Sequence, residues 1–312
     1  MHSLSAFKIV LLFALGSIPA YCAPSLLSPR GLCGTAAPSE PLREVYQKLA
    51  SRPSENESAE GYESRKVETT IEIDTWFHIL STKENAKLIS DTMINDQLSF
   101  LQAAYKDAKI SYRLKGVTRQ TNDAWARNTD EIAMKTALRK GTYNTLNVYF
   151  HTDLEQSADG AAARAMSSTA GTERVLGFCT LPDPSINASS PRAAYVKDGC
   201  NILGHTMPGG PIPHYNKGGT AIHEVGHWNG LLHVFEGESC SPDNDGDYID
   251  DTPQQSSSTV GCPQQKDSCP NLPGMDSIHN YMDYSSDDCY ESFTQGQLER
   301  MRYMWSTMRE GK

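Results

Sequence analysis

Three histidines and one glutamate in the C-terminal half of the chain have the types and spacing of a metal-dependent hydrolase, reading H-E-x-x-H-x-x-G-x-x-H. His223 and His227 are four residues apart, so on a helix they share one face and can bind one metal ion. Glu224 is placed to take a proton from a metal-bound water as a general base. Gly230 accepts a left-handed backbone, so the chain can turn sharply and bring in His233 as the third ligand. Three imidazoles and a water form the open site of catalytic zinc (Zn2+).

The elements that must position this motif are visible as hydrophobic patterns. Residues 67–75 alternate apolar and polar side chains, which predicts a strand with one apolar and one polar face. Helical and strand patterns then follow in turn, which is typical of an α/β layer. They predict a helix over 91–108, a strand over 110–117, a helix over 130–138, a strand over 146–151, the motif helix from about Thr220, and a last helix over 293–308.

A second motif lies downstream, where residues 280–284 read N-Y-M-D-Y and resemble the Met-turn of metzincin metalloproteases, with Met282 as its structural methionine. Together with the histidine motif and the closing residues 293–301, this turn is similar to the pappalysin family. Within that family the chain resembles the secreted extracellular metalloproteases of fungi, from about Val67 to the C-terminus. The resemblance implies an α/β (α+β) metzincin-type domain with a twisted mixed sheet, an active-site helix, the Met-turn and a C-terminal helix.

The resemblance also implies a function, which is that of a secreted zinc-dependent endopeptidase hydrolysing peptide bonds of extracellular proteins. Tyr284 matches the metzincin tyrosine that helps to stabilise the tetrahedral intermediate. Residues 175–182 resemble the edge strand above the cleft, which would bind an extended peptide as an added strand. Two other readings stay open: a zinc-binding module without catalysis, against which Glu224 argues, and a zinc hydrolase acting on a small molecule.

The first third of the chain predicts an exported precursor. Residues 1–20 contain an apolar run too short to span a bilayer and read as a signal peptide. Residues 21–65 are rich in Ser, Pro, Glu and Ala and read as a prosegment, with helical spacing only over 42–50. The protease domain is then expected over 66–312. The net charge of 28 − 38 = −10 favours protein or peptide substrates over nucleic acid, and no membrane anchor is expected. The oligomeric state stays open.

Cysteine usage fits an oxidising compartment, because six of the seven cysteines beyond Cys22, which lies at the edge of the signal peptide, can pair. The overlapping pattern of the family implies Cys240 with Cys269 and Cys262 with Cys289, which leaves Cys179 with Cys200. Cys33 is the odd one, in a C-G-T element that resembles one seen in related proenzymes. Its thiolate could occupy the open zinc position and keep the precursor latent. The alternative is an unpaired or externally paired cysteine.

Four further sites are expectations of the sequence. Residues after the Met-turn line the specificity pocket in metzincins, and Asp287 matches the pocket aspartate of family members that prefer Arg or Lys after the scissile bond. The alternative is that Asp287 and its neighbour Asp288 both point to solvent. The acidic stretch 243–253 could hold calcium (Ca2+), although its spacing departs from the EF-hand loop. Asn56 and Asn187 begin N-x-S glycosylation sequons. Three other histidines, His151, His205 and His214, are not expected to bind metal.

Overall fold

The sheet of this protein has five strands in the order β2-β1-β3-β5-β4, as a computed structural model describing residues 33–51, 69–155 and 175–312 shows. The strands are β1 Ile71–Ser81, β2 Ile110–Thr121, β3 Leu146–His151, β4 Gly177–Cys179 and β5 Cys200–Leu203. The first four in spatial order are parallel, and β4 pairs antiparallel with β5 at one edge. The predicted mixed sheet is therefore confirmed. The signal peptide, Val67 and Asn56 lie outside the described residues.

Helices cover both faces of the sheet. Helices α3 (Asp91–Ala104) and α6 (Gly219–Trp228) pack with Ile73, Phe77 and Ile79 of β1 in the main hydrophobic core, while α4 (Asp123–Ala126) and α5 (Glu131–Leu138) lie on the other face. The predicted alternation ended at Thr75, but β1 continues to Ser81, and its second face is buried in this continuation. His78 and Leu80 are fully buried there. Their burial depends on helices that come later in the chain, so a pattern within one strand does not report it.

Local capping explains several element boundaries. The Ser90 side chain accepts a hydrogen bond from the Met93 amide at the start of α3, and Asp130 does the same for Ala133 at the start of α5. Helix α7 (Gln295–Met304) begins with a capping box formed by Thr294 and Gln297. A π turn, η5 (Trp305–Arg309), continues α7, and two 3-10 turns, η3 (Arg192–Tyr195) and η4 (Gly204–Thr206), flank β5. Predicted and observed ends agree to within a few residues, except that β4 is much shorter than residues 175–182.

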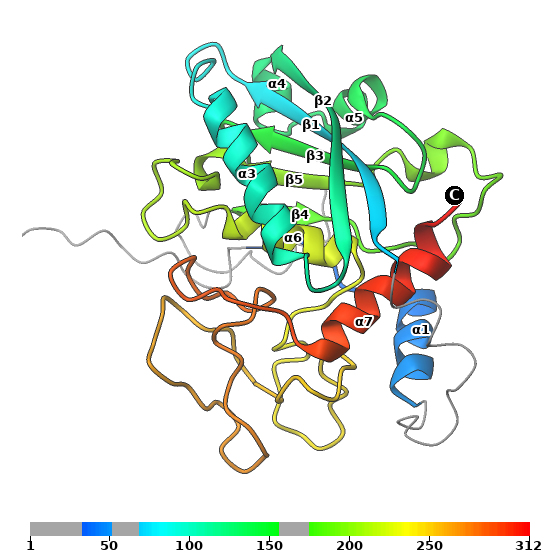
Figure 1. Ribbon diagram of the computed structural model, residues 1–312, viewed down its shortest axis with the longest axis vertical. Helices are drawn as coiled ribbons and strands as arrows, with labels where there is room; N and C mark the ends of the chain where they lie inside the picture. Colours follow the sequence, from blue (N-terminus) through cyan, green and yellow to red (C-terminus); the bar gives the residue numbers. More distant parts are fainter. Residues whose placement is uncertain (1–32, 52–68, 156–174) are drawn as a thin grey trace, which may run out of the picture.

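Between α6 and α7 the chain forms no named helix or strand, and it descends in yellow and orange loops below the sheet (Figure 1). Two disulfides, Cys240–Cys269 and Cys262–Cys289, close parts of this loop region onto itself. The buried carboxylate of Asp283 adds a polar tie, because it accepts hydrogen bonds from both the amide and the hydroxyl of Thr259. Disulfides and side-chain hydrogen bonds therefore stabilise this region, as backbone hydrogen bonds between strands stabilise the sheet.

Residues 33–51, within the predicted prosegment, pack on the rest of the protein. Residues 33–38 form an extended strap that runs parallel to β4, with a backbone bridge between Cys33 and Gly177. Helix α1 (Glu40–Ala50) follows and lies beside α7, blue against red in Figure 1. The strap and α1 thus reach two different surfaces of the 69–312 region.

Candidate active site and metal centre

Helix α6 carries the first half of the histidine motif, and all ten of its residues are buried. Its C-terminus is held by Asn229, whose side-chain amide donates to the Val225 carbonyl and to the Tyr112 hydroxyl. Gly230 then adopts a φ of 87°, a left-handed conformation that glycine reaches without strain. A Cβ at Gly230 would also lie 2.5 Å from Met304 Cγ. The chain turns here and brings His233 back toward the helix, as the spacing predicted.

The three motif imidazoles fit a metal cation. His223 Nδ1 lies 2.7 Å from the Tyr281 carbonyl oxygen, and His227 Nδ1 lies 2.9 Å from that of Leu231. Because a carbonyl only accepts, each Nδ1 carries the proton and each Nε2 presents a lone pair. The Nε2 atoms of His223 and His233 both lie 3.2 Å from His227 Nε2. Lone pairs converging at this distance need a cation between them, which is the arrangement of metal ligands.

Burial keeps the rings of His223 and His227 neutral, as metal ligands must be. Burial, with a smaller effect from the neighbouring His233, lowers the pKa of His223 to about 3. The same two causes, with His223 added, hold the pKa of His227 well below its usual range.

Glu224 lies beside the imidazoles and is 1% exposed. Its Oε2 accepts hydrogen bonds from the Thr35 hydroxyl at 3.2 Å and the Cys33 thiol at 3.5 Å. Burial raises the pKa of its carboxyl to about 8, and these hydrogen bonds oppose the rise. A Cβ at Gly177 would come within 2.8 Å of Glu224 Cγ, so the backbone of β4 packs directly on this carboxylate. A carboxyl that titrates near neutral pH can both accept and release a proton.

The strap places Cys33 at the imidazoles. Its Sγ lies 3.5 Å from His227 Nε2, and the four donor atoms of Cys33 and the three histidines all fall within 4.8 Å of one another. Among the described residues this is the one cluster of three or more metal-binding side chains, and Cys33 is the one cysteine outside a disulfide. Burial raises the pKa of the thiol, and the charge of Glu224 raises it further. The structure thus brings Cys33 next to the three histidines, which is the position that the latency hypothesis requires.

Hydrogen bonds fix the strap along the cleft. The Gly34 amide donates to the Gly177 carbonyl at 2.8 Å, and the Cys179 amide donates to the Thr35 hydroxyl at 3.0 Å. From the opposite wall, the Tyr284 hydroxyl donates to the Cys33 carbonyl at 3.5 Å. Tyr284 therefore points its hydroxyl into the cleft, where an oxygen of a bound chain can reach it.

Met282 lies below the histidines and is fully buried. Its carbonyl accepts from the Val234 amide, just past the third histidine. A Cβ at Gly226 would lie 2.5 Å from Met282 Sδ, so α6 approaches this turn as closely as glycine allows. The predicted Met-turn therefore packs under the predicted metal site.

Asp287 is buried beside a hollow on one side of the histidines, while Asp288 is exposed. Asp287 Oδ2 accepts from the amides of Lys217 and Gly219, and Oδ1 is buried without a hydrogen-bond partner. Burial raises the pKa of this carboxyl to about 6. Asp288 instead pairs with the side chains of Lys217 and His214. The alternative in which both aspartates point to solvent therefore fails for Asp287. The hollow is lined by Cys33, Leu176, Tyr215, Thr220, His223, Glu224, Tyr284 and Tyr290.

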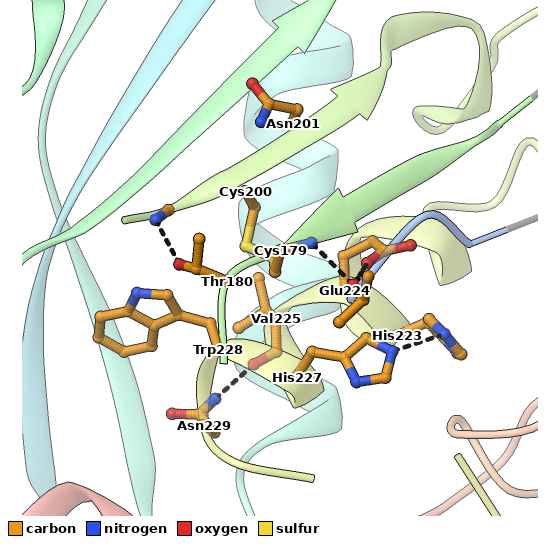
Figure 2. The surroundings of a disulfide bond; sticks show 12 residues. Cys179, Thr180, Cys200, Asn201, His223, Glu224, Val225, His227, Trp228 and Asn229 are labelled. Atoms are coloured by element: carbon orange, nitrogen blue, oxygen red, sulfur yellow. Dashed lines mark hydrogen bonds between the residues drawn. A yellow bond between two sulfur atoms is a disulfide. The ribbon is translucent and has the colours of Figure 1, made fainter. Parts of the chain in front are cut away.

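The structure contains the three predicted disulfides. Figure 2 shows Cys179–Cys200 joining β4 to β5 next to Glu224, with the side chains of His223 and His227 on the same side of α6. This bond ties the short edge strand to the body of the sheet. The wall of the cleft is therefore held covalently where only three residues form the strand.

The remaining predicted sites have different outcomes. The calcium hypothesis finds no support, because Asp247 and Asp251 direct carboxylate oxygens to Thr252, Thr294 and nearby backbone amides. His151 is buried and hydrogen-bonded to Trp125 and Asn201. His214 pairs with Asp288, and His205 is outside the metal-binding cluster. Asn187 is exposed, as a glycosylation site must be.

Three imidazole lone pairs beside a buried carboxylate in a cleft define a metal-dependent hydrolase. Residues 177–306 match the Peptidase_M43 family, described as pregnancy-associated plasma protein-A. An extracellular metalloprotease of Aspergillus oryzae is 58% identical over 311 residues, 97% of this chain and 98% of the relative. An extracellular metalloprotease of Pyricularia oryzae is 44% identical over 282 residues, 90% of each chain.

Two solved structures are similar over most of their length. Mature mirolysin of Tannerella forsythia, in complex with a cleaved peptide, is 26% identical with a TM-score of 0.59, covering 78% of this chain and 96% of that one. A promirolysin mutant is 25% identical with a TM-score of 0.62, covering 89% and 94%. The chain belongs to the Peptidase_M43 family, the pappalysins. It is a secreted zinc metalloendopeptidase, as the resemblance implied. No helix among the described residues is long and apolar enough to cross a membrane.

Sequence reasoning missed several residues of this site. Thr35 contacts both Glu224 and the edge strand, and Tyr215 and Tyr290 line the hollow beside Asp287. The T of the C-G-T element was the one available signal for Thr35. The two tyrosines come from separate loops, and no local spacing relates them to the histidines.

Proposed function

We propose that this protein cleaves peptide bonds with His223, His227 and His233 as its zinc ligands and Glu224 as its general base. The observation that carries the proposal is the convergence of three imidazole lone pairs at 3.2 Å beside a buried carboxylate. When bound there, zinc would polarise the scissile carbonyl and favour ionisation of a water molecule. The donor set of three neutral imidazoles suits this metal.

The residues of the chain then have separate roles in the reaction. Glu224, whose buried carboxylate lies beside the histidines, accepts the proton of the attacking water and later passes it to the departing amine. The Tyr284 hydroxyl, which donates to a backbone carbonyl of the strap, can donate to the carbonyl oxygen of a substrate as charge develops on it. The edge strand β4 binds the peptide through its free backbone groups, as it now binds Gly34.

Replacing Glu224 tests the mechanism. In the processed enzyme, Glu224→Ala removes the base and no ligand, so turnover of a fluorogenic peptide should fall by roughly 10^2–10^4-fold while bound zinc stays stoichiometric. His227→Ala should lose the metal as well. Glu299→Ala, an exposed carboxylate on α7, is the matched control and should leave both properties unchanged. Near wild-type turnover by the Glu224→Ala enzyme with zinc bound would refute the assignment.

The substrate preference follows from Asp287, which we assign to the pocket for the side chain just past the scissile bond. Its Oδ1 is buried without a partner, and a buried acceptor of this kind gains most from a charged donor such as Arg or Lys. The mirolysin structure with a cleaved peptide supports a peptide ligand for the related cleft.

A cut-site profile tests this preference. The wild type should favour Arg and Lys after the cut. Asp287→Asn keeps the shape and the Lys217 contact, and should lower kcat/KM for basic residues by roughly 10–100-fold, because a hydrogen bond to a charged group contributes about 1.5–3 kcal/mol. Asp288→Asn is the control, since Asp288 is exposed and paired with surface residues. An unchanged profile in Asp287→Asn would remove this residue from the pocket.

Latency of the precursor is the third part of the proposal. Cys33 can supply a fourth ligand while the strap fills the cleft, so the precursor should be inactive until the strap leaves. Processing near Arg65-Lys66 would separate the prosegment from the domain at 66–312. The promirolysin structure, which covers 89% of this chain, supports a related precursor form.

A further inference from the structure

Helix α1 buries two side chains against the turn that follows the second histidine and against the C-terminal helix. Leu42 is 1% exposed and Tyr46 is 0% exposed, four residues apart on one face of the helix. They pack in a hydrophobic cluster with Leu232, Met304 and Met308, which is separate from the main core. These three residues form the floor of what we call the α1 groove.

Tyr46 also makes three directional contacts in the α1 groove. Its hydroxyl donates to the Gly230 carbonyl at 3.1 Å, at the turn between the second and third histidines. Its ring stacks on Tyr248 at 5.7 Å, and the Arg300 guanidinium lies 4.9 Å from the ring centroid. A buried aromatic ring with a satisfied hydroxyl and a cation over its face is typical of an interface anchor.

The order of the chain separates these contacts from the processing point. Cys33 and α1 both precede residues 52–68, and β1 follows them. A cut near Arg65-Lys66 therefore breaks the covalent link but none of the contacts of Tyr46. Before the cut, the link holds α1 at a high effective concentration. After the cut, retention depends only on the affinity of the strap and α1 for the domain.

We infer that the α1 groove is a docking surface whose occupant is residues 33–51 of this chain, held without a covalent link after processing. Activation then has two steps, which are the cut and the later departure of the prosegment. In this complex Tyr46 holds the prosegment in the α1 groove, and Cys33 blocks the cleft at the three histidines. The inference rests on the proposed function for the cleft that the strap fills, for latency of the precursor and for processing near Arg65-Lys66.

The balance of forces favours retention over immediate release. Departure would expose the apolar side chains on both sides of the α1 groove, and it would leave the Gly230 carbonyl without its donor. An isolated helix of 11 residues is marginal in water, so α1 would also unfold as it leaves. Because α1 must fold again to rebind, the loss of chain entropy opposes rebinding. The contacts of Tyr46 must therefore supply enough affinity to outweigh this loss.

The test measures retention without catalysis. The full-length Glu224→Ala precursor, with a site for a highly specific protease placed within residues 55–63, is cut to completion and passed through gel filtration and native mass spectrometry. The cut prosegment should elute with the domain. Tyr46→Ala should weaken retention by about 100-fold, and Tyr46→Phe, which loses only the hydroxyl contact, by about 5-fold. Gln47→Ala, the exposed neighbour on α1, is the matched control and should behave as the parent.

A Cys33→Ser precursor distinguishes retention by Tyr46 from blocking of the cleft by Cys33. Its prosegment should still be retained after the cut. The inference fails if the parent prosegment leaves at once, if Tyr46→Ala and Gln47→Ala are retained equally, or if Cys33→Ser releases the prosegment while Tyr46→Ala does not. If Tyr46→Ala does not fold, Tyr46→Phe and Leu42→Ala take its place. Peptidase activity is not read in this experiment, so failure of the proposed mechanism would be seen separately.

Discussion

The sheet half of the molecule and the loop region between α6 and α7 build the same site by different physical means. The sheet half, including α6, supplies the first two histidines and Glu224 on elements with regular backbone hydrogen bonds and a large apolar core. The loop region supplies His233, Tyr284 and Asp287 without a named helix or strand. The loop side of the site is therefore held by disulfides and buried polar groups in place of a ladder of strands.

Buried carboxylates in the loop region hold nearby segments of the chain through hydrogen bonds. Asp276, which pairs with Lys266, accepts hydrogen bonds from the amide and hydroxyl of Ser268, and Asp283 holds Thr259 against the Met-turn. In the sheet half the comparable buried polar group is a histidine, His78, which bonds to neighbouring strands. The two regions should therefore respond differently to reduction and to pH.

Removing the Cys262–Cys289 disulfide should have the largest effect. With a sequence separation of 27 between the cysteines, the loss of cross-linking should cost about 3–4 kcal/mol of the free energy of unfolding. Denaturant unfolding of the double serine variant measures this cost. Hydrogen exchange should also rise across residues 229–294 and leave β1 and β3 protected.

The matched control is the double serine variant of Cys179 and Cys200, whose separation of 21 residues gives a similar entropic cost. Because β5 stays paired with β3, exchange in the loop region should remain as in the wild type. Equal exchange in the two variants would show that the loop region does not depend on its own disulfides.

Acid should affect the sheet half through His78. Its Nδ1 accepts from the Thr118 hydroxyl and its Nε2 donates to the Asn147 side chain, so the neutral ring is satisfied. Burial lowers its pKa to about 4. Above about pH 6.5 the folded and unfolded chains both hold it neutral. As pH falls from 6.5 to 4 the unfolded chain binds a proton that the folded chain does not, so stability falls by up to about 3 kcal/mol.

Denaturant unfolding at pH 7, 6, 5 and 4 tests this expectation. His78→Gln can keep an amide near Asn147 and cannot titrate, so its stability should fall less over this range. An acid sensitivity identical to that of the wild type would assign the loss to other groups.

The loop region should respond in the opposite direction through Asp247. This carboxyl is 3% exposed, and its Oδ2 has no hydrogen-bond partner. Burial raises its pKa to about 7, so the folded chain favours the protonated form and stability falls as pH rises from about 4 past 7. Asp247→Asn should add about 2 kcal/mol at pH 8, roughly half of what such a shift corresponds to, because the new amide lacks a partner too. At pH 5 it should be neutral. A loss of stability at pH 8 would contradict the assignment.

The sequence predicted the sheet half better than the loop region because periodic burial leaves a local pattern. The strand over 146–151 was placed as observed, and the motif helix was placed within one residue. β5 was missed because four fully buried residues have no alternation. The burial of His78 was missed because α4 and α5, which cover it, are distant in the chain.

For the site itself, the motif predicted the histidines whose donor atoms the structure brings together, because binding one metal ion requires a fixed spacing in the sequence. The inward orientation of Asp287 and the anchoring role of Tyr46 depend on contacts across more than 60 residues, with Gly219 and Gly230. The acidic stretch suggested calcium because composition does not reveal that Asp247 Oδ1 and both oxygens of Asp251 accept hydrogen bonds from the protein itself.

The close approach of Gly226 to Met282 has a consequence for how such proteins are recognised in sequence collections. The two x positions of H-E-x-x-H are written as free because they bind no metal, yet here the first, Val225, is fully buried and the second faces Met282. Any larger residue at position 226 would require the Met282 side chain to move. A search that demands glycine there, together with a methionine at the distance of the turn, would exclude roughly 20-fold more chance matches for each residue fixed.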